Sequence, residues 1–169
     1  LLYKQEEGSL RTDETAEALA KMDCSEFVSR YLKEVGLFDR VPRFTTADMV
    51  TDNFKIKHKD KLQFMDGSED KSAKSNAFIP QAGDIFVWRH KGSGHTGVIM
   101  RYIKEKDQVI VLESIGLGDP SDGKHCFAEQ SSLNTERGCN TTVISTYTRT
   151  GNALVQHNGW RGYYRPLIK

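Results

Sequence analysis

The chain has 169 residues and a net charge of +1, from 24 basic and 23 acidic side chains, and 37% of its residues are hydrophobic. This length fits a single domain, 1–169, that buries enough surface to fold without disulfides or metals. The nearly balanced charge argues against a nucleic-acid-binding protein, which normally carries a large basic excess. Apolar runs are short, as at residues 109–112, whereas a membrane-spanning helix needs about 20 apolar residues.

The N-terminus shows no targeting signal. The chain begins at Leu1 without an initiator methionine, and no charged start leads into an apolar core, so no signal peptide is visible. We therefore expect a trimmed or mature fragment. A signal, an anchor or another domain upstream of Leu1 would each be compatible with this start.

Three cysteines leave at least one thiol free if the other two pair. Cys126 and Cys139 lie in one loop-like stretch, and Cys24 lies far from them in the sequence. A disulfide between Cys126 and Cys139 would suit an exported protein. Buried free cysteines are also common, so both states stay open for this pair.

Residues 15–36 show apolar side chains at helical spacing. Asp23 and Ser25 interrupt this pattern, and such residues favour helix caps over helix interiors. We therefore expect two helices that meet near Asp23, with Cys24 at or near the start of the second. Gly36 suits the C-terminal end of that helix. A short helix is expected within residues 44–50.

Strand signals begin after Pro80. Three β-branched or aromatic runs are separated by the turn sequences KGSG and KEKD, which predicts an antiparallel meander. The three runs cover residues 84–90, 95–103 and 108–115.

A long polar loop is expected at residues 116–139, followed by further strands at 141–149 and 161–169, the last of them an edge strand. Helices followed by an antiparallel sheet of about five strands predict the α+β class.

One cysteine, one histidine and one glutamate could together perform nucleophilic catalysis. A cysteine attacks only as the thiolate, and a helix N-terminus stabilises an anion by roughly 0.3–1 kcal/mol. Cys24 is expected at such a terminus. His95 begins a strand after a glycine-rich turn and could accept the thiol proton. Glu113 ends the next strand, where antiparallel neighbours lie about 5 Å apart, so it could fix the imidazole.

Two segments of the chain, around Cys24 and around His95, resemble known sequence motifs. DCSEFVSRYL resembles the nucleophile helix of the NlpC-type papain-like cysteine peptidases, and PQAGDIFVWRHKGSGHTGVIM resembles their second motif, a strand and turn followed by Gly-His-x-Gly-Val. The resemblance implies a papain-like fold and spans residues 23–115. The family's glycine after Asp-Cys-Ser is Glu26 here. Where the family has a tyrosine upstream of the cysteine, this chain has Thr12, and Tyr3 could take the place of that tyrosine.

The third catalytic group differs from the NlpC pattern. NlpC-type enzymes usually place a second histidine on the strand where this chain has Glu113. In this respect the chain is similar to the CHAP amidases, the cysteine- and histidine-dependent amidohydrolases, which often use Glu or Asn there. We expect Glu113 to be the third group, and His125 is the alternative.

The resemblance implies hydrolysis of an amide bond in peptidoglycan through a thioester on Cys24, with neither metal nor organic cofactor. We expect Asp23, Ser25, Trp88 and Gly94 to contact the substrate. The implied partners are peptidoglycan stem peptides, with an upstream domain or an immunity protein as further options. The implied state is a monomer that is exported to the periplasm or cell envelope.

Other interpretations remain open from the sequence. The bond cut could be a stem-peptide bond or the amide between N-acetylmuramic acid and L-alanine. The chain could instead be an acyltransferase, or an inactive wall-binding domain if Glu26 blocks the cleft. A zinc site with Cys24 and His95 is a further alternative, although no close cysteine pair supports it.

Overall fold

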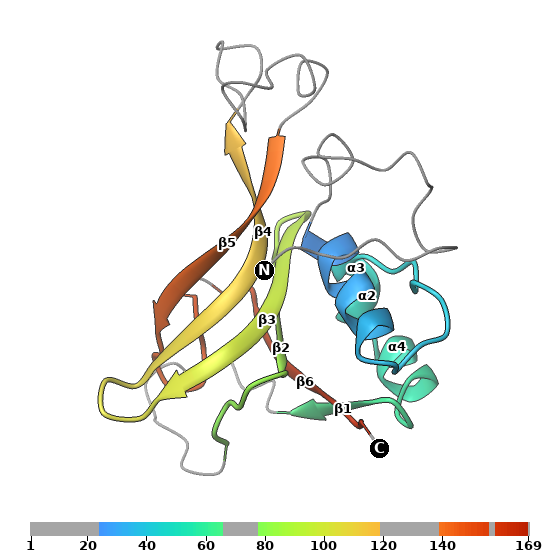
Figure 1. Ribbon diagram of the computed structural model, residues 1–169, viewed down its shortest axis with the longest axis horizontal. Coiled ribbons are helices and arrows are strands. Elements are labelled where there is room, and N and C mark those ends of the chain that lie inside the picture. Colours follow the sequence, from blue (N-terminus) through green and yellow to red (C-terminus); the bar gives the residue numbers. More distant parts are fainter. Residues whose placement is uncertain (1–23, 66–77, 119–138, 156–157, 169) are drawn as a thin grey trace.

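The computed structural model describes residues 24–65, 78–118, 139–155 and 158–168. Within these ranges, one antiparallel sheet of six strands packs short helices against one face (Figure 1). No helix in these ranges is long and apolar enough to cross a membrane. The elements are α2 (Cys24–Glu34), α3 (Thr46–Met49), α4 (Asp52–Lys57), β1 (Leu62–Met65), β2 (Ile85–His90), β3 (Ser93–Ile103), β4 (Gln108–Gly118), β5 (Cys139–Thr148) and β6 (Trp160–Pro166).

Helix α2 has the start and end that the sequence predicts. It begins at Cys24, and Gly36 beyond its end has a φ of 83°. The N–H groups of Gly36 and Leu37 donate to the carbonyls of Lys33 and Leu32, each at 3.0 Å. These are the two hydrogen bonds of a Schellman motif, which glycine favours because it adopts positive φ without strain. The helix predicted before Asp23 lies outside the described residues.

The short helix expected within residues 44–50 is also present. Thr45 caps α3, and its side chain and that of Asp48 form a reciprocal capping box. A second short helix, α4, follows at once and was not predicted.

The strand order is β1-β6-β2-β3-β4-β5, and every neighbouring pair is antiparallel. The predicted β2-β3-β4 meander is confirmed. Two expectations were wrong, because the sheet has six strands instead of about five and β6 is not an edge. Both corrections come from β1, which pairs Leu62 with Pro166 along the outer side of β6. Four residues are too few to show a strand period, and their partner lies at the other end of the chain.

A tight hairpin connects β2 to β3. Lys91 and Gly92 have φ values of 51° and 78°, and His90 pairs with Ser93 across them. Two consecutive positive φ values are typical of a type I′ turn, the form that best matches the twist of paired strands. This hairpin places His95 near the start of β3, beside Trp88 of β2.

The sheet has a core on each face. The α2 side chains of Phe27, Val28 and Leu32 pack with Ile85, Val87, Val98 and Leu112 of the sheet. The neighbouring strand positions point the other way and join a second cluster. This second cluster includes Phe86, Ile99, Val109, Val111, Trp160 and Tyr163.

The aspartate of the Gly-Asp motif links the start of β2 to the neighbouring strand β6. The Asp84 carboxylate is 1% exposed and accepts hydrogen bonds from Nε and Nη2 of Arg165, both at 2.8 Å. It also accepts the Gln81 backbone N–H at 2.9 Å. Removing one partner of a buried ion pair destabilises the fold, because the remaining charge is left without compensation.

We expect Asp84→Ala to lower the free energy of unfolding by about 3 kcal/mol, because it leaves the Arg165 guanidinium without its carboxylate. Arg43→Ala is the control, since it breaks an ion pair whose arginine is 65% exposed and should cost less than about 1 kcal/mol. Urea denaturation of both variants tests this. Equal losses in the two variants would contradict the structural role of Asp84.

Candidate active site

Cys24 is the first residue of α2, and its thiol is free and half-buried. The first N–H groups of a helix have no partner within it, and the helix dipole places partial positive charge at this end. Both features can stabilise a negative charge at this position. The sequence therefore folds so that its motif cysteine lies where an anion is stabilised.

The His95 imidazole lies between a thiol and a carboxylate. Its Nε2 is 2.7 Å from Oε1 of Glu113, and a further side-chain hydrogen bond joins it to Cys24. Only 13% of the His95 side chain is exposed. The rings of Phe86 and Trp88 lie beside it, with centroids at 5.6 and 6.1 Å. The structure thus brings together the three residues that the sequence nominated.

Gly97 explains how the histidine reaches the glutamate. A Cβ at Gly97 would lie 2.7 Å from Cε2 of Phe86 and 3.1 Å from Cβ of Glu113. Any side chain there would displace the Phe86 ring or the stem of the Glu113 side chain. The glycine of the Gly-His-x-Gly motif therefore leaves the space in which His95 and Glu113 meet.

Glu113 is a buried and fully engaged carboxylate. It is 2% exposed, and the Tyr147 hydroxyl donates to it at 2.7 Å from Oε1 and 2.9 Å from Oε2. Burial favours the neutral acid, but hydrogen bonds from His95, Ser145 and Tyr147 outweigh it and lower the pKa of Glu113. The carboxylate is therefore ionised at neutral pH.

The pKa of His95 shifts in the opposite direction. Burial opposes the imidazolium, but hydrogen bonds to Cys24 and Glu113 and the negative charges of both raise its pKa from 6.5 to about 9. The imidazolium therefore stabilises the fold fully below pH 6.5, and this stabilisation is lost as the pH rises through 9. The ionised Glu113 stabilises the fold fully above pH 4.5, its unperturbed pKa. This stabilisation is lost as the pH falls through the lowered pKa of the folded state.

The residues expected to contact substrate occupy different positions. Ser25 is buried on α2, and Trp88 is half-buried beside His95. Gly94 faces α3, where a Cβ would lie 2.8 Å from Cβ of Thr46 and 2.9 Å from the Trp88 carbonyl oxygen. Its local role is thus close packing of the hairpin against α3. Asp23 lies outside the described residues, as do His125, Tyr3, Thr12 and the pairing of Cys126 with Cys139.

Glu26, the departure from the family motif, points away from the nucleophile. Residues two apart on a helix are separated by about 200°, so Cys24 and Glu26 lie on different faces of α2. The Glu26 carboxylate is 3.5 Å from Arg30 and 3.4 Å from Arg43. This arrangement does not support a blocked cleft.

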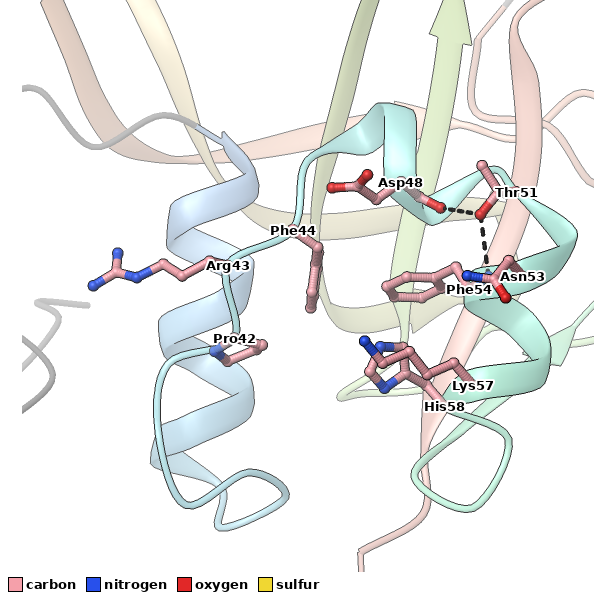
Figure 2. Close-up of a pocket in the computed structure, with 9 residues that line it drawn as sticks. All are labelled: Pro42, Arg43, Phe44, Asp48, Thr51, Asn53, Phe54, Lys57 and His58. Atoms are coloured by element: carbon pink, nitrogen blue, oxygen red, sulfur yellow. Dashed lines mark hydrogen bonds between the residues drawn. The ribbon is translucent and has the colours of Figure 1, made fainter.

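A separate pocket of about 430 Å³ lies between the segment before α3 and helix α4 (Figure 2). Phe44 and Phe54 pack edge to face inside it, and the ring of His58 lies 4.6 Å from Phe54. Cys24, His95 and Glu113 do not line it. Within the described ranges, no three histidine, cysteine or acidic side chains are grouped to hold a metal ion.

A family model described as the CHAP domain matches residues 15–114, more than half of the chain. The chain belongs to the CHAP family. The match confirms the CHAP resemblance seen in the sequence and includes Cys24, His95 and Glu113. CHAP domains are typically cysteine- and histidine-dependent amidohydrolases or peptidases, and membership implies hydrolysis of the peptidoglycan type in the cell envelope or outside the cell. No curated protein matches the chain.

Two polar contacts of this CHAP domain were missed from the sequence. Tyr147 and Ser145 bond Glu113 from β5, beyond the residues that the family model matches. Strand alternation within β5 puts both residues on one face. The sequence alone, however, gives no register between β4 and β5, so it could not show that this face carries Glu113.

We expect Glu113→Gln to lower the pKa of His95 from about 9 toward 6.5, because the substitution removes a negative charge from Nε2. A side-chain ¹⁵N NMR titration of the histidines measures this shift. Glu105→Gln is the control, since it removes one exposed carboxylate from the β3–β4 turn. A His95 pKa that stays near 9 in Glu113→Gln would show that Glu113 does not charge the imidazole.

Proposed function

We propose that this CHAP domain hydrolyses an amide bond of peptidoglycan stem peptides, as a cell-wall endopeptidase. Cys24 is the nucleophile, His95 the general base and acid, and Glu113 the residue that orients His95. The observation that carries the proposal is the continuous chain from the thiol through the imidazole to a buried carboxylate, with Nε2 and Oε1 2.7 Å apart. The same three roles define the triad logic of other acyl-transfer hydrolases.

The reaction starts from the thiolate of Cys24 and the imidazolium of His95. The sulfur attacks the carbonyl carbon, and the backbone N–H of Cys24 at the helix start can donate to the developing oxyanion. The C–N bond breaks as His95 gives its proton to the leaving amine, which leaves a thioester on the sulfur. His95 then takes a proton from water, which attacks the thioester, and the C–S bond breaks to return the thiolate.

Burial of the carboxylate gives Glu113 its orienting role. Only one carboxylate oxygen contacts His95, and because an ionised carboxylate can only accept, this contact fixes Nε2 as a protonated nitrogen. We propose that the substrate contacts Trp88, whose half-buried ring forms a wall beside His95. Asp23, Ser25 and Gly94 are the further proposed substrate contacts.

We also propose that residues 1–169 form one catalytic domain and that the protein acts as an exported monomer. An inactive wall-binding domain fits less well, because burying an ionised carboxylate against an imidazole is costly and would serve no purpose in a binding surface. The engagement of Glu26 by two arginines also argues against a blocked site.

The test is to incubate wild type, Cys24→Ala and Glu105→Gln with peptidoglycan sacculi of several chemotypes and with soluble muropeptides. Mass spectrometry then identifies the fragments. We expect wild type and Glu105→Gln to release the same fragments and Cys24→Ala to lose at least about 10³-fold in rate, since removing a nucleophile leaves only binding and oxyanion stabilisation. Fragment masses name the bond. If wild type releases no fragments from any of these peptidoglycans, the proposed substrate is wrong.

A further inference from the structure

Strand β5 lies beyond the residues that the family model matches, yet it supplies donors to the site. The Tyr147 hydroxyl contacts both oxygens of the Glu113 carboxylate, at 2.7 and 2.9 Å, and Ser145 donates a further side-chain hydrogen bond. Glu113 therefore has one partner on its functional side, His95, and two partners from β5 behind it.

The sheet register explains why these two β5 side chains meet Glu113. Directly paired residues of antiparallel strands share a face, and so do residues two apart. The pairs on this face of β4 and β5 are Glu113↔Val143, Val111↔Ser145 and Val109↔Tyr147. The Tyr147 ring packs perpendicular to Phe86, with centroids 5.8 Å apart, so its hydroxyl is held in one position.

The two β5 donors answer a physical need of the site. A carboxylate that is 2% exposed loses its water, and it stays ionised only if protein donors replace that water. His95 reaches one oxygen only, whereas Tyr147 reaches both. The pKa of Tyr147 is raised by burial and then by its hydrogen bond to Glu113 and the charge of that carboxylate, so the hydroxyl keeps its proton and remains a donor.

We propose that Tyr147, supported by Ser145, is a positioning residue that fixes the orientation and the ionised state of Glu113 and thereby of His95. This inference rests on the proposed function for the meaning of the site, but its main test needs no substrate. The catalytic unit then extends from α2 through β3 and β4 to β5, and includes a strand outside the family match.

The direction of the pH effect follows from the groups around the carboxylate. Those that face Glu113 are His95 from β3 and Tyr147 and Ser145 from β5, and Cys24 of α2 acts through His95. Loss of the tyrosine hydroxyl removes a donor from the carboxylate while its burial remains, so the pKa of Glu113 rises. Glu113 then protonates at a higher pH, and the thiolate–imidazolium pair loses its support there.

The experiment compares Tyr147→Phe with Tyr102→Phe in the full chain. Tyr102 is a matched control because its hydroxyl also donates to a carboxylate, Asp107, at 2.9 Å, and that carboxylate also accepts a hydrogen bond from Nε of Arg149 at 2.9 Å. The first readout is the rate at which iodoacetamide alkylates Cys24 as a function of pH, followed on the Cys24 peptide by mass spectrometry. The second is kcat and KM on muropeptides.

In a plot of the Cys24 alkylation rate against pH, we expect the rise on the acid side (the acid limb) to move to higher pH in Tyr147→Phe. It should stay in place in Tyr102→Phe. We also expect kcat at pH 6 to fall about tenfold with KM unchanged, as for loss of a hydrogen bond to a charged group. Ser145→Ala should shift the limb in the same direction by less, which keeps the test valid if Tyr147→Phe folds poorly.

An alkylation profile of folded Tyr147→Phe and Ser145→Ala that coincides with wild type would overturn the inference. A shifted profile in a protein whose wild type cuts no peptidoglycan would support the positioning role and refute the proposed substrate. The two claims therefore fail separately.

Discussion

The site depends on one buried negative charge, the carboxylate of Glu113. Transferring an ionised carboxylate out of water is costly unless it is paired and hydrogen-bonded, and at 2% exposure this one has lost nearly all contact with solvent. Its partners therefore come from the protein, and they fix its two oxygens in place. The charge in turn holds the His95 imidazole in one orientation and favours its protonated form. The proton balance between imidazole and thiol thus follows from how the sheet buries a single side chain.

Two glycines make this arrangement compatible with a packed sheet. Gly97 leaves room on one face of β3 for the Phe86 ring and Glu113, and Gly94 allows α3 to approach the other face. The residue between them on the first face is His95. Helix α2 packs on the face opposite the second core and presents its first residue to the imidazole. The CHAP motif therefore includes residues needed for packing as well as reactive residues. Its glycines have no reactive side chain, but they allow Phe86, Glu113 and α3 to approach β3 closely.

Local signals in the sequence were enough to predict much of this. The helix start at Cys24, its end at Gly36 and the hairpin before His95 each depend on residues a few positions apart. Features set by distant pairing were not visible. Strand β1 has only four residues, and it is a strand because it pairs with β6 at the C-terminal end of the chain. The same pairing makes β6 an interior strand of the sheet. From the sequence, Tyr147 is simply an aromatic residue in a predicted strand. Its role at Glu113 becomes visible only with the register of β4 and β5.

The most direct test of the account is to trap the covalent intermediate. Wild-type protein is mixed with a soluble muropeptide, quenched with acid at early times, and its mass is measured intact and after digestion. We expect an added mass on Cys24 equal to an acylated substrate fragment, which decays as product accumulates and is absent in Cys24→Ala. Product formation at an undiminished rate in Cys24→Ala, with no adduct on Cys24 in wild type, would contradict it.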